Sequence, residues 1–265
     1  LIRTQVRDHL LGHFQPGLPF SVQHRVLPML AYRPYEIQVA LQDEVQEQVG
    51  LPVSVRDPQQ VLSVVVSDAG GALEAHLGVS RTDHNLSAWP GGMRRFAREP
   101  DQVSRSEFKL LEALEAFGVT LDDAHHALDL GASPGGWTRI LTGRGLRVVA
   151  VDPADLHPSV ESHPLVTHLR ATAGDAFSRR DLPVFDLVAN DLRMEARHSA
   201  KLTVRAAGLL KPGAGTAIMT LKLPAKRPLR VLDDAMSILS ARYRIRGARH
   251  LFHNRHEVTA HLSLT

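Results

Sequence analysis

The sequence predicts an α/β protein with a doubly wound sheet over residues 104–265 and a small α+β unit in residues 1–80. Three observations lead to this fold class. Short apolar runs alternate with amphipathic runs after residue 104, as strands and helices do in βαβ units. A glycine-rich turn, GASPGG, follows the first of these apolar runs. Finally, a hydrophobic content of 43% in 265 residues is enough for a sizeable core.

Apolar runs bounded by turn residues predict seven strands in the larger unit. They are HALDL (126–130), RVVAV (147–151), LVTHL (165–169), FDLVAN (185–190), TAIMTLKL (216–223) and two further runs near 242–251 and 256–263. Helices are expected between the earlier strands, at 135–144, 155–162, 195–210 and 228–240. The last two runs have only a short link, so we expect them to form an antiparallel hairpin that makes the sheet mixed.

The amino-terminal stretch predicts one helix and four strands. The helix covers 35–50, because Ile37, Leu41 and Val45 recur near helical spacing and Gly50 provides a stop. The strands are expected at 21–28, 53–57, 60–68 and 72–80, with Ala69-Gly70-Gly71 turning the last pair. Residues 81–103 carry several prolines, glycines and charges and are predicted to be a linker.

Composition limits the classes of function that need to be considered. The chain has no cysteine, which excludes disulfides and thiolate zinc sites. It has 15 histidines, but no ligand pattern is evident among them, and we expect no metal. No apolar run is long enough for a transmembrane helix, and the first residues do not resemble a secretory signal. We therefore expect a cytoplasmic protein without a membrane partner.

Basic residues are unevenly distributed, although the net charge is only +3. One cluster is Arg94, Arg95 and Arg98. A second, between 222 and 255, is opposed only by Asp233 and Asp234 and consists of Lys222, Lys226, Arg227, Arg230, Arg242, Arg244, Arg246, Arg249 and Arg255. Such clusters suit a polyanion such as RNA, although the solvated faces of an arginine-rich protein would give the same pattern.

The glycine-rich turn is typical of a nucleotide-cofactor site. Gly131, Gly135 and Gly136 permit tight turning and close backbone approach, and the following helix offers free N–H groups. The dinucleotide fingerprint G-x-G-x-x-G fails, because Ser133 and Pro134 stand in its place. S-adenosylmethionine, which has no phosphate, remains as the candidate cofactor. A strand–helix turn without any ligand is the structural alternative.

Three acids at predicted strand ends favour the cofactor interpretation, since ligands of such sheets bind at the carboxyl ends of strands. Asp129 could meet the ammonium group of S-adenosylmethionine. Asp152, 21 positions after Gly131, could accept hydrogen bonds from both ribose hydroxyls. Asp175 could accept one from the adenine amino group.

Several motifs occur together in a familiar order: VSRSEFKLLEAL, DLGASPGGW, FDLVANDL, LKLP and HNRHEVTAHL. In these, residues 103–265 resemble the FtsJ/RrmJ family of RNA 2′-O-methyltransferases, and most closely its bacterial members that act on 23S rRNA. The resemblance implies a Rossmann-like class I methyltransferase fold. Residues 21–80 more loosely resemble a THUMP domain, a small RNA-binding module, through VRDPQQVLSVVVSDAGGALEAHLG.

The resemblance implies a catalytic tetrad. Its members here are Lys109 in SRSEFKL, Asp191 in NDL, Lys222 in LKLP and Glu257 in RHEV. The implied cofactor site comprises Asp129, Gly131, Ser133, Pro134, Gly135, Gly136, Trp137, Asp152, Asp175 and Asp191. One departure is the Leu-Arg-Met-Glu run after Asp191, where one branch of the family has Met-Ala-Pro; this bears on the RNA substrate, not on the chemistry.

The residues themselves support part of this tetrad. Asp191 and Lys222 each close an apolar run at the ligand end of a sheet, whereas Lys109 and Glu257 alone would more often be surface residues. A ribose hydroxyl is a poor nucleophile, so we assign Lys222 as the general base or orienting group. Burial and Lys109 should lower its pKa, while Asp191 and Glu257 should raise it.

The expected function is transfer of a methyl group from S-adenosylmethionine to an RNA ribose 2′-hydroxyl. Resemblance favours a cytidine of 23S rRNA, in free rRNA or a pre-ribosomal particle bound through residues 94–98 and 222–255. One alternative is a catalytically idle RNA-binding or ribosome-assembly protein that keeps the fold. Another is a base or protein methyltransferase, although Asn-Asp-Leu-Arg at 190–193 is not the Asn/Asp-Pro-Pro-aromatic run usual there.

Overall fold

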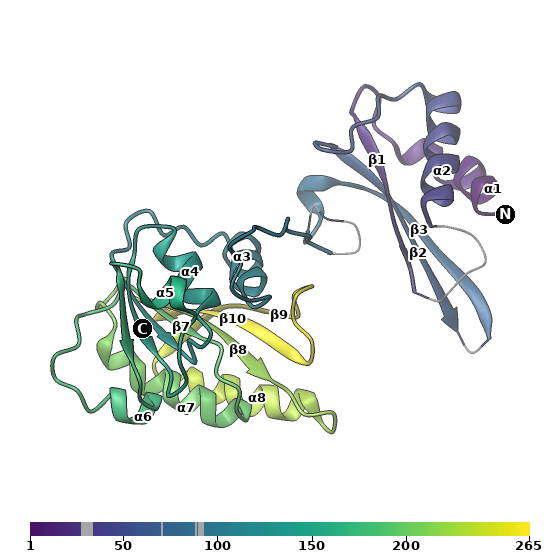
Figure 1. Cartoon of the computed structure of the whole chain (residues 1–265). Coiled ribbons are helices and arrows are strands. Elements are labelled where there is room, and N and C mark those ends of the chain that lie inside the picture. The colour runs from purple at the N-terminus through teal and green to yellow at the C-terminus, as the bar shows by residue number, and fades with distance from the viewer. Residues whose placement is uncertain (28–33, 70, 88, 90–92) are drawn as a thin grey trace. The chain divides into compact units, whose positions relative to one another are not determined.

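The computed structural model describes residues 1–27, 34–69, 71–87, 89 and 93–265. It divides into two compact units, Leu1–Arg95 and Phe96–Thr265, which are described separately (Figure 1). Three parts of the predicted pattern lie outside the described residues. They are residue 28 at the end of a predicted strand, Gly70 in a predicted turn, and residues 88 and 90–92 in the predicted linker.

The amino-terminal unit packs two helices on a three-stranded sheet. Its elements are α1 (Ile2–His9), β1 (Phe20–Val26), α2 (Pro34–Val49), β2 (Gln60–Ala69) and β3 (Ala72–Arg81), with short 3-10 turns at Leu11–His13 and Thr82–His84. The sheet order is β1-β2-β3, with β1 parallel and β3 antiparallel to β2. Alternate residues of β2, such as Leu62 and Val64, join Ile37 and Leu41 of α2 in one core.

Two features of this unit differ from the expected pattern. The strand predicted at 53–57 is wrong: only Val53 pairs, in an isolated bridge to Phe20. The run is flanked by Pro52 and Pro58, which cannot donate backbone hydrogen bonds to a neighbouring strand. Helix α1 was not predicted, because it has a single buried residue, Val6.

A buried glutamate holds α1 against α2. Glu44 accepts hydrogen bonds from Arg3 Nε (3.0 Å) and from Arg7 Nε (2.6 Å) and Nη2 (2.9 Å). The hydrogen bond from Arg7 is the main reason that the pKa of Glu44 falls to about 2, although burial opposes the shift. The carboxylate thus adds a polar tie to the apolar packing of Val6.

The carboxy-terminal unit has a seven-stranded mixed sheet, as predicted. The strands are β4 (His126–Leu130), β5 (Arg147–Val151), β6 (Val166–Leu169), β7 (Leu187–Asn190), β8 (Thr216–Lys222), β9 (Tyr243–Arg249) and β10 (Glu257–Leu264). Their order is β6-β5-β4-β7-β8-β10-β9. β9 and β10 form the predicted antiparallel hairpin, and β10 also pairs antiparallel with β8.

Helices cover both faces of this sheet. They are α3 (Glu107–Ala116), α4 (Gly136–Thr142), α5 (Pro158–Glu161), α6 (Ala173–Ala176), α7 (Ala196–Ala206) and α8 (Pro228–Leu239). Figure 1 shows α3, α4 and α5 on one face and α6, α7 and α8 on the other. Each layer has its own core: Leu110, Trp137 and Leu141 pack on the first face, and Ala200 and Ala235 on the second.

The order of strands determines where a ligand can bind. β4, β5, β7 and β8 are parallel neighbours, so their carboxyl ends share one edge. The connection after β4 runs through α4 on one face, and that after β7 runs through α7 on the other. The helices therefore diverge between β4 and β7, which opens the crevice in which ligands of doubly wound sheets bind.

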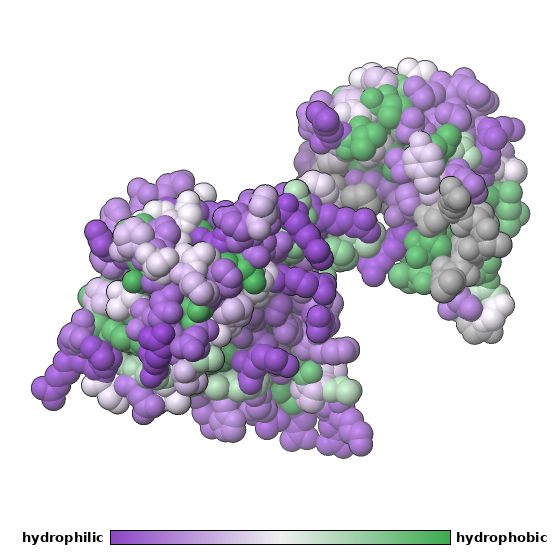
Figure 2. Space-filling view, in the orientation of Figure 1, coloured by the Kyte–Doolittle hydropathy of each residue, from purple (hydrophilic) through white to green (hydrophobic). Residues whose placement is uncertain are grey.

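Hydrophilic residues cover most of the carboxy-terminal unit on the face drawn in Figure 2. Of the described helices, none combines the length and the apolar character needed to span a membrane.

Replacement of Glu44 by glutamine should loosen α1 at neutral pH. Because the folded-state pKa of Glu44 lies below its ordinary value, its stabilising effect is complete above about pH 4.5 and is lost as the pH falls toward about 2. Hydrogen exchange in α1 should therefore be faster in E44Q than in the natural protein at pH 7, and the difference should shrink in acid. Exposed Glu47→Gln on the same helix is the control, and equal exchange in both variants would contradict the role of Glu44.

Candidate active site

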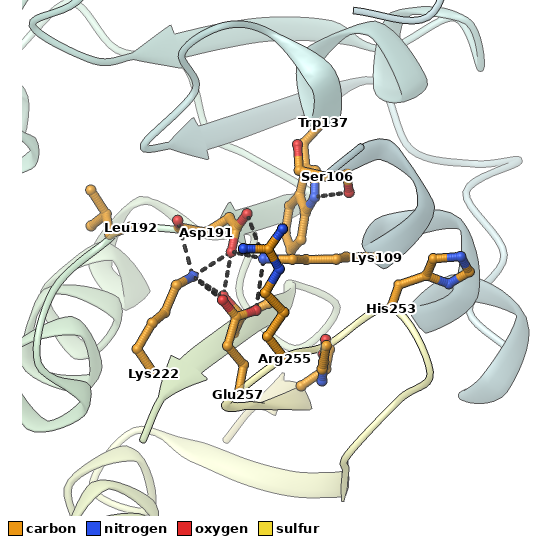
Figure 3. Close-up of polar contacts among 12 residues, drawn as sticks. Ser106, Lys109, Trp137, Asp191, Leu192, Lys222, His253, Arg255 and Glu257 are labelled. Carbon is orange, nitrogen blue, oxygen red and sulfur yellow. Dashed lines mark hydrogen bonds and ion pairs between the residues drawn. The ribbon is translucent and has the colours of Figure 1, made fainter. Parts of the chain in front are cut away.

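Four charged side chains converge at the carboxyl edge of the sheet (Figure 3). Lys109 lies in the first turn of α3, and Asp191 directly follows β7. Lys222 ends β8 and Glu257 begins β10, and these two are direct partners in the antiparallel pair. The four predicted tetrad residues are therefore brought together from four elements that are distant in the sequence.

Each lysine of this tetrad lies between two carboxylates. Lys109 Nζ is 3.3 Å from Asp191 Oδ1 and 2.7 Å from Glu257 Oε2. Lys222 Nζ forms a hydrogen-bonded ion pair with Asp191 Oδ1 and lies 3.9 Å from Glu257 Oε1. The four side chains are only 12–20% exposed, so neither Lys109 nor Glu257 is a solvated surface residue. With all four ionised, the ring of alternating charges is neutral.

Asp191 is held by more than the lysines. Thr220 Oγ1 donates to its Oδ1 at 2.5 Å, and Lys222 Nζ donates to its backbone oxygen at 3.1 Å. The preceding Asn190 is fully buried, and its Oδ1 accepts the N–H of Leu192 at 3.0 Å, which shapes the turn that carries Asp191. Thr220 was not predicted as a site residue, although it lies two residues before Lys222 and so on the same side of β8.

The pKa values of the two central residues, Asp191 and Lys222, are both lowered, but for different reasons. Burial alone would raise the pKa of Asp191, but the charges of Lys222 and Lys109 and the hydrogen bonds from Lys222 and Thr220 outweigh it and lower the pKa. For Lys222, burial is the largest influence and lowers its pKa, despite the opposing effects of Asp191 and Glu257. The competition that the sequence left open is thus decided by burial, which lowers the pKa of Lys222 below its ordinary value.

A second pocket, of about 340 Å³, opens between the ends of β4, β5 and β7. Among the predicted cofactor residues, six line it: Gly131, Ser133, Pro134, Trp137, Asp152 and Asp191. Gly131 has φ +79°, and a Cβ there would lie 3.0 Å from the Cα of Leu192. Gly135 has φ +113° and caps α4. Glycine is therefore needed at both positions for the chain to turn beneath the pocket.

The three predicted acids occupy different environments. Asp152 lines the pocket and accepts the N–H of Ser133 at 3.1 Å and of Ala154 at 2.9 Å. Asp129 is 1% exposed; its Oδ2 accepts from Thr138 Oγ1 at 2.7 Å, while its Oδ1 has no hydrogen-bond partner among the described residues. Burial raises the pKa of Asp129 to about 7. A buried oxygen without a partner is costly unless a ligand donates to it.

Asp175 does not line this pocket. It lies in α6, where its Oδ2 accepts from Thr172 Oγ1 at 2.7 Å and its N–H donates to the same hydroxyl. Its side chain therefore helps to cap a helix in this structure, and its contact with adenine stays a prediction.

Trp137 links the smaller pocket to the tetrad. It lies in the first turn of α4, where it is buried, and its Nε1 donates to the backbone oxygen of Ser106 at 2.8 Å. The same oxygen accepts the N–H of Lys109 at 3.0 Å. The first turn of α3 is therefore tied to the glycine-rich turn, which fixes Lys109 relative to the pocket.

A larger pocket of about 860 Å³ lies on the other side of the tetrad. It shares Arg105, Ser106, Asp191 and Arg193 with the cofactor pocket. Its remaining lining residues are Arg98, Phe108, Lys109, Met194, Lys222, Leu223, Phe252, His253, Asn254, Arg255, His256 and Glu257. From the predicted basic clusters, Arg98, Lys222 and Arg255 line it, whereas the arginines of β9 do not. Asp191 thus stands where two pockets meet.

In the described part of the chain, no group of three or more histidines or acids is arranged to hold a metal ion. Within the trio His250, His253 and His256, two side chains make contacts with other residues. His253 Nδ1 donates to Glu112, and His250 Nε2 contacts the backbone oxygen of Arg255.

Comparison with known proteins agrees with this geometry. Residues 102–225 match the FtsJ-like methyltransferase family, and this segment contains Lys109, Asp191 and Lys222 of the tetrad. This segment is therefore similar to the FtsJ-like methyltransferase family. The FtsJ-like resemblance inferred from the motifs is thereby confirmed, whereas the THUMP-like resemblance of the first unit stays a prediction.

Curated relatives to which this chain is similar are named ribosomal RNA large subunit methyltransferase M. The one from Laribacter hongkongensis is 37% identical over 187 residues, which are 66% of this chain and 52% of the relative. That from Halorhodospira halophila is 32% identical over 212 residues, 79% of this chain and 59% of the relative. The chain thus spans little more than half the length of these relatives.

Solved structures support the fold of the FtsJ-like domain. The fibrillarin/Nop5p complex superposes with a TM-score of 0.51 at 13% identity, covering 65% of this chain and 92% of the other. A hemolysin-like protein from Streptococcus thermophilus superposes with a TM-score of 0.50 at 18% identity, covering 75% of this chain and 74% of the other. At such low identity, these similarities concern the fold alone.

Replacement of Asp191 by asparagine should lower the pKa of Lys222 still further. The charge of Asp191 is the strongest influence that raises that pKa, so its loss leaves burial and Lys109 with less opposition. NMR titration of isotope-labelled lysines would measure the change, and exposed Lys211 provides an internal reference. An unchanged or higher pKa at Lys222 would contradict the assigned electrostatics.

Proposed function

We propose that this chain is an S-adenosylmethionine-dependent methyltransferase that acts on a ribose 2′-hydroxyl of ribosomal RNA. The observation that carries this proposal is the Lys-Asp-Lys-Glu ring at the junction of two pockets. One pocket suits a small cofactor, and the other is large and lined by arginines. The names of the curated relatives support large-subunit ribosomal RNA as the substrate.

The residues around the smaller pocket fit S-adenosylmethionine. The turn at Gly131 lets a ligand approach the backbone closely, and Trp137 contributes a flat apolar wall. Asp152 supplies a carboxylate that suits a ribose diol, and the unpartnered Oδ1 of Asp129 suits a donor near the end of β4. When bound, the cofactor supplies a methyl group on a positively charged sulfur.

The tetrad can activate the acceptor hydroxyl. Lys222 Nζ, neutral more often than that of an exposed lysine, would accept the proton of the 2′-hydroxyl as the methyl group passes from the cofactor's sulfur to that oxygen, with the sulfur–methyl bond broken and a thioether left behind. Asp191 and Glu257 then stabilise the ammonium that results. Lys109, whose charge is balanced by the same two carboxylates, orients the acceptor. The charge of the ring changes from −1 to 0 as the proton arrives, so the step creates no unpaired buried charge.

We further propose which residues bind the RNA and in which compartment the protein encounters it. Arg98 and Arg255, from the basic segments 94–98 and 222–255, would contact phosphates at the mouth of the larger pocket. The amino-terminal unit would serve as a THUMP-like RNA-binding module. Ribosomal RNA, free or in a pre-ribosomal particle and encountered in the cytoplasm, is the expected substrate, and a cytidine is the expected nucleotide.

Replacement of Lys222 by alanine should reduce methyl transfer by about 100- to 10,000-fold, the range expected for loss of a general base. S-adenosylmethionine binding should stay within about twofold, because Lys222 lies outside the cofactor pocket. Tritiated cofactor, total RNA and nuclease mapping measure the transfer, with exposed Lys211→Ala as the control. If the label is on a ribose 2′-oxygen, the RNA chain resists alkaline cleavage at that one nucleotide. Retained turnover in K222A would refute the role of Lys222, and absence of label from the natural protein would favour the idle protein.

Replacement of Asp152 by alanine should weaken cofactor binding by about tenfold or more, since hydrogen bonds to charged groups contribute about 1.5–3 kcal/mol. Binding of RNA should be little affected, because Asp152 does not line the larger pocket. Calorimetry with S-adenosylhomocysteine and a separate RNA-binding assay would check both outcomes, and Asp155→Ala, on the same loop but outside the pocket, is the matched control. Unchanged affinity for the cofactor in D152A would remove Asp152 from the site.

A further inference from the structure

The larger pocket has an aromatic wall that the methyl-transfer chemistry does not use. Phe108, Phe252 and His253 line it together. The ring centroid of His253 lies 5.2 Å from that of Phe108 and 5.0 Å from that of Phe252. Phe96 stacks on Phe108 from behind, with centroids 5.7 Å apart and planes inclined by 16°. The wall is thus a connected layer of rings.

This layer leaves one large ring exposed. Phe252 is 40% exposed, although Phe108 and His253 beside it are largely covered. A phenylalanine that served only to fill the core would lie beneath its neighbours, where its burial stabilises the fold. Phe252 instead offers an apolar surface to a pocket that is otherwise lined by charged groups.

A buried carboxylate holds this exposed segment in place. Glu112 on α3 is 4% exposed, and it accepts hydrogen bonds from Phe252 N (2.8 Å), His253 N (2.9 Å) and His253 Nδ1 (2.8 Å). A buried glutamate must be well partnered, and all its partners here belong to two residues of one loop. The loop is therefore pre-organised, which lowers the entropic cost of binding a ligand on it.

The charges around the aromatic wall suit a nucleic acid. Arg98, Arg105, Arg193 and Arg255 are exposed and line the same pocket. In Figure 3, Arg255 extends toward the tetrad, and His253 lies farther along the same loop. Arginines contact phosphates, and aromatic rings stack on unpaired bases, so the two kinds of residue together form a site for single-stranded RNA.

We propose that Phe252 and His253, held by Glu112, form a stacking subsite for an unpaired RNA base next to the methylated ribose. This inference rests on the proposed function and deepens it. A pocket of about 860 Å³ is at the upper end of the range for ligand sites, about 300–1,000 Å³, and is larger than a single ribose requires. The subsite would take any unpaired base, since stacking tolerates every base, and would select single-stranded or flipped-out targets over duplex.

Binding of short RNA to the full chain tests the subsite. The probes are a fluorescent single-stranded RNA oligonucleotide and a matched oligonucleotide that carries abasic riboses. Phe252→Ala and His253→Ala should each weaken binding of the first probe by about tenfold, as expected from loss of base stacking. They should leave binding of the abasic probe and the salt dependence unchanged. Arg255→Ala should weaken both probes and reduce the salt slope by about one.

Two further variants separate stacking from folding. Leu229→Ala removes an exposed apolar side chain of α8 outside the pocket and should change neither affinity. Glu112→Gln acts through the loop: it should weaken binding of the base-bearing probe, and Phe252→Ala should add little to that loss. If F252A and H253A bind the base-bearing probe as L229A does, the subsite is wrong. If they weaken both probes equally, the loop contributes structure and not stacking, which also overturns it.

The methyl-transfer assay distinguishes this inference from the proposed function. Normal RNA binding by F252A and H253A, with ribose methylation by the natural protein, would remove the subsite and leave the function intact. Base-dependent binding through Phe252 without any methylation of ribose would support the subsite and contradict the proposed function.

Discussion

The contact between Asp191 and the two lysines is the interaction on which the site depends. Two ammonium groups and two carboxylates in a largely buried cluster are costly to desolvate unless each charge meets its opposite. Asp191 contacts both lysines and so joins the cluster into one ring. Its geometry is in turn set by Thr220 and by the turn after Asn190. Any loss of this carboxylate leaves two buried cations with only Glu257 between them.

The fold brings the ring and the cofactor pocket together through one feature of topology. The helices diverge between β4 and β7, and Gly131 and Asp191 directly follow these two strands. Close packing there leaves no room for a Cβ at Gly131 beside Leu192. In the proposed reaction a methyl donor and its acceptor meet at a short distance, which requires that the two pockets share a wall. Asp191 and its neighbours form that wall.

Helix α3 supplies residues to several parts of the larger pocket. Its first turn is held by Glu107, which accepts from Val103 N (2.7 Å) and from Arg139 Nη1 (2.8 Å) on α4. Within one and a half turns, the helix supplies Phe108 to the aromatic wall, Lys109 to the ring and Glu112 to the loop of Phe252. A rigid helix that presents three such groups keeps them in fixed relative positions, as a site on a loop could not.

Local pattern was sufficient for the alternation of strands and helices after residue 104, for the antiparallel hairpin, and for the glycine-rich turn at Gly131. These depend on periodicity and on backbone conformation, which neighbouring residues decide. Local pattern was insufficient in two places: α1 is tied to α2 through Glu44, and the Pro-flanked residues 53–57 make only a bridge.

Only the tertiary structure decided the environment of the site. Lys109 and Glu257 are 148 positions apart in the chain, and no periodicity marks either of them. They meet because β10 lies beside β8 and because Trp137 ties α3 to the cofactor turn. The pKa of Lys222, the position of Asp175 outside the pocket, and the aromatic wall held by Glu112 likewise arise from burial and distance. These quantities are properties of packed elements and are not present in any single segment.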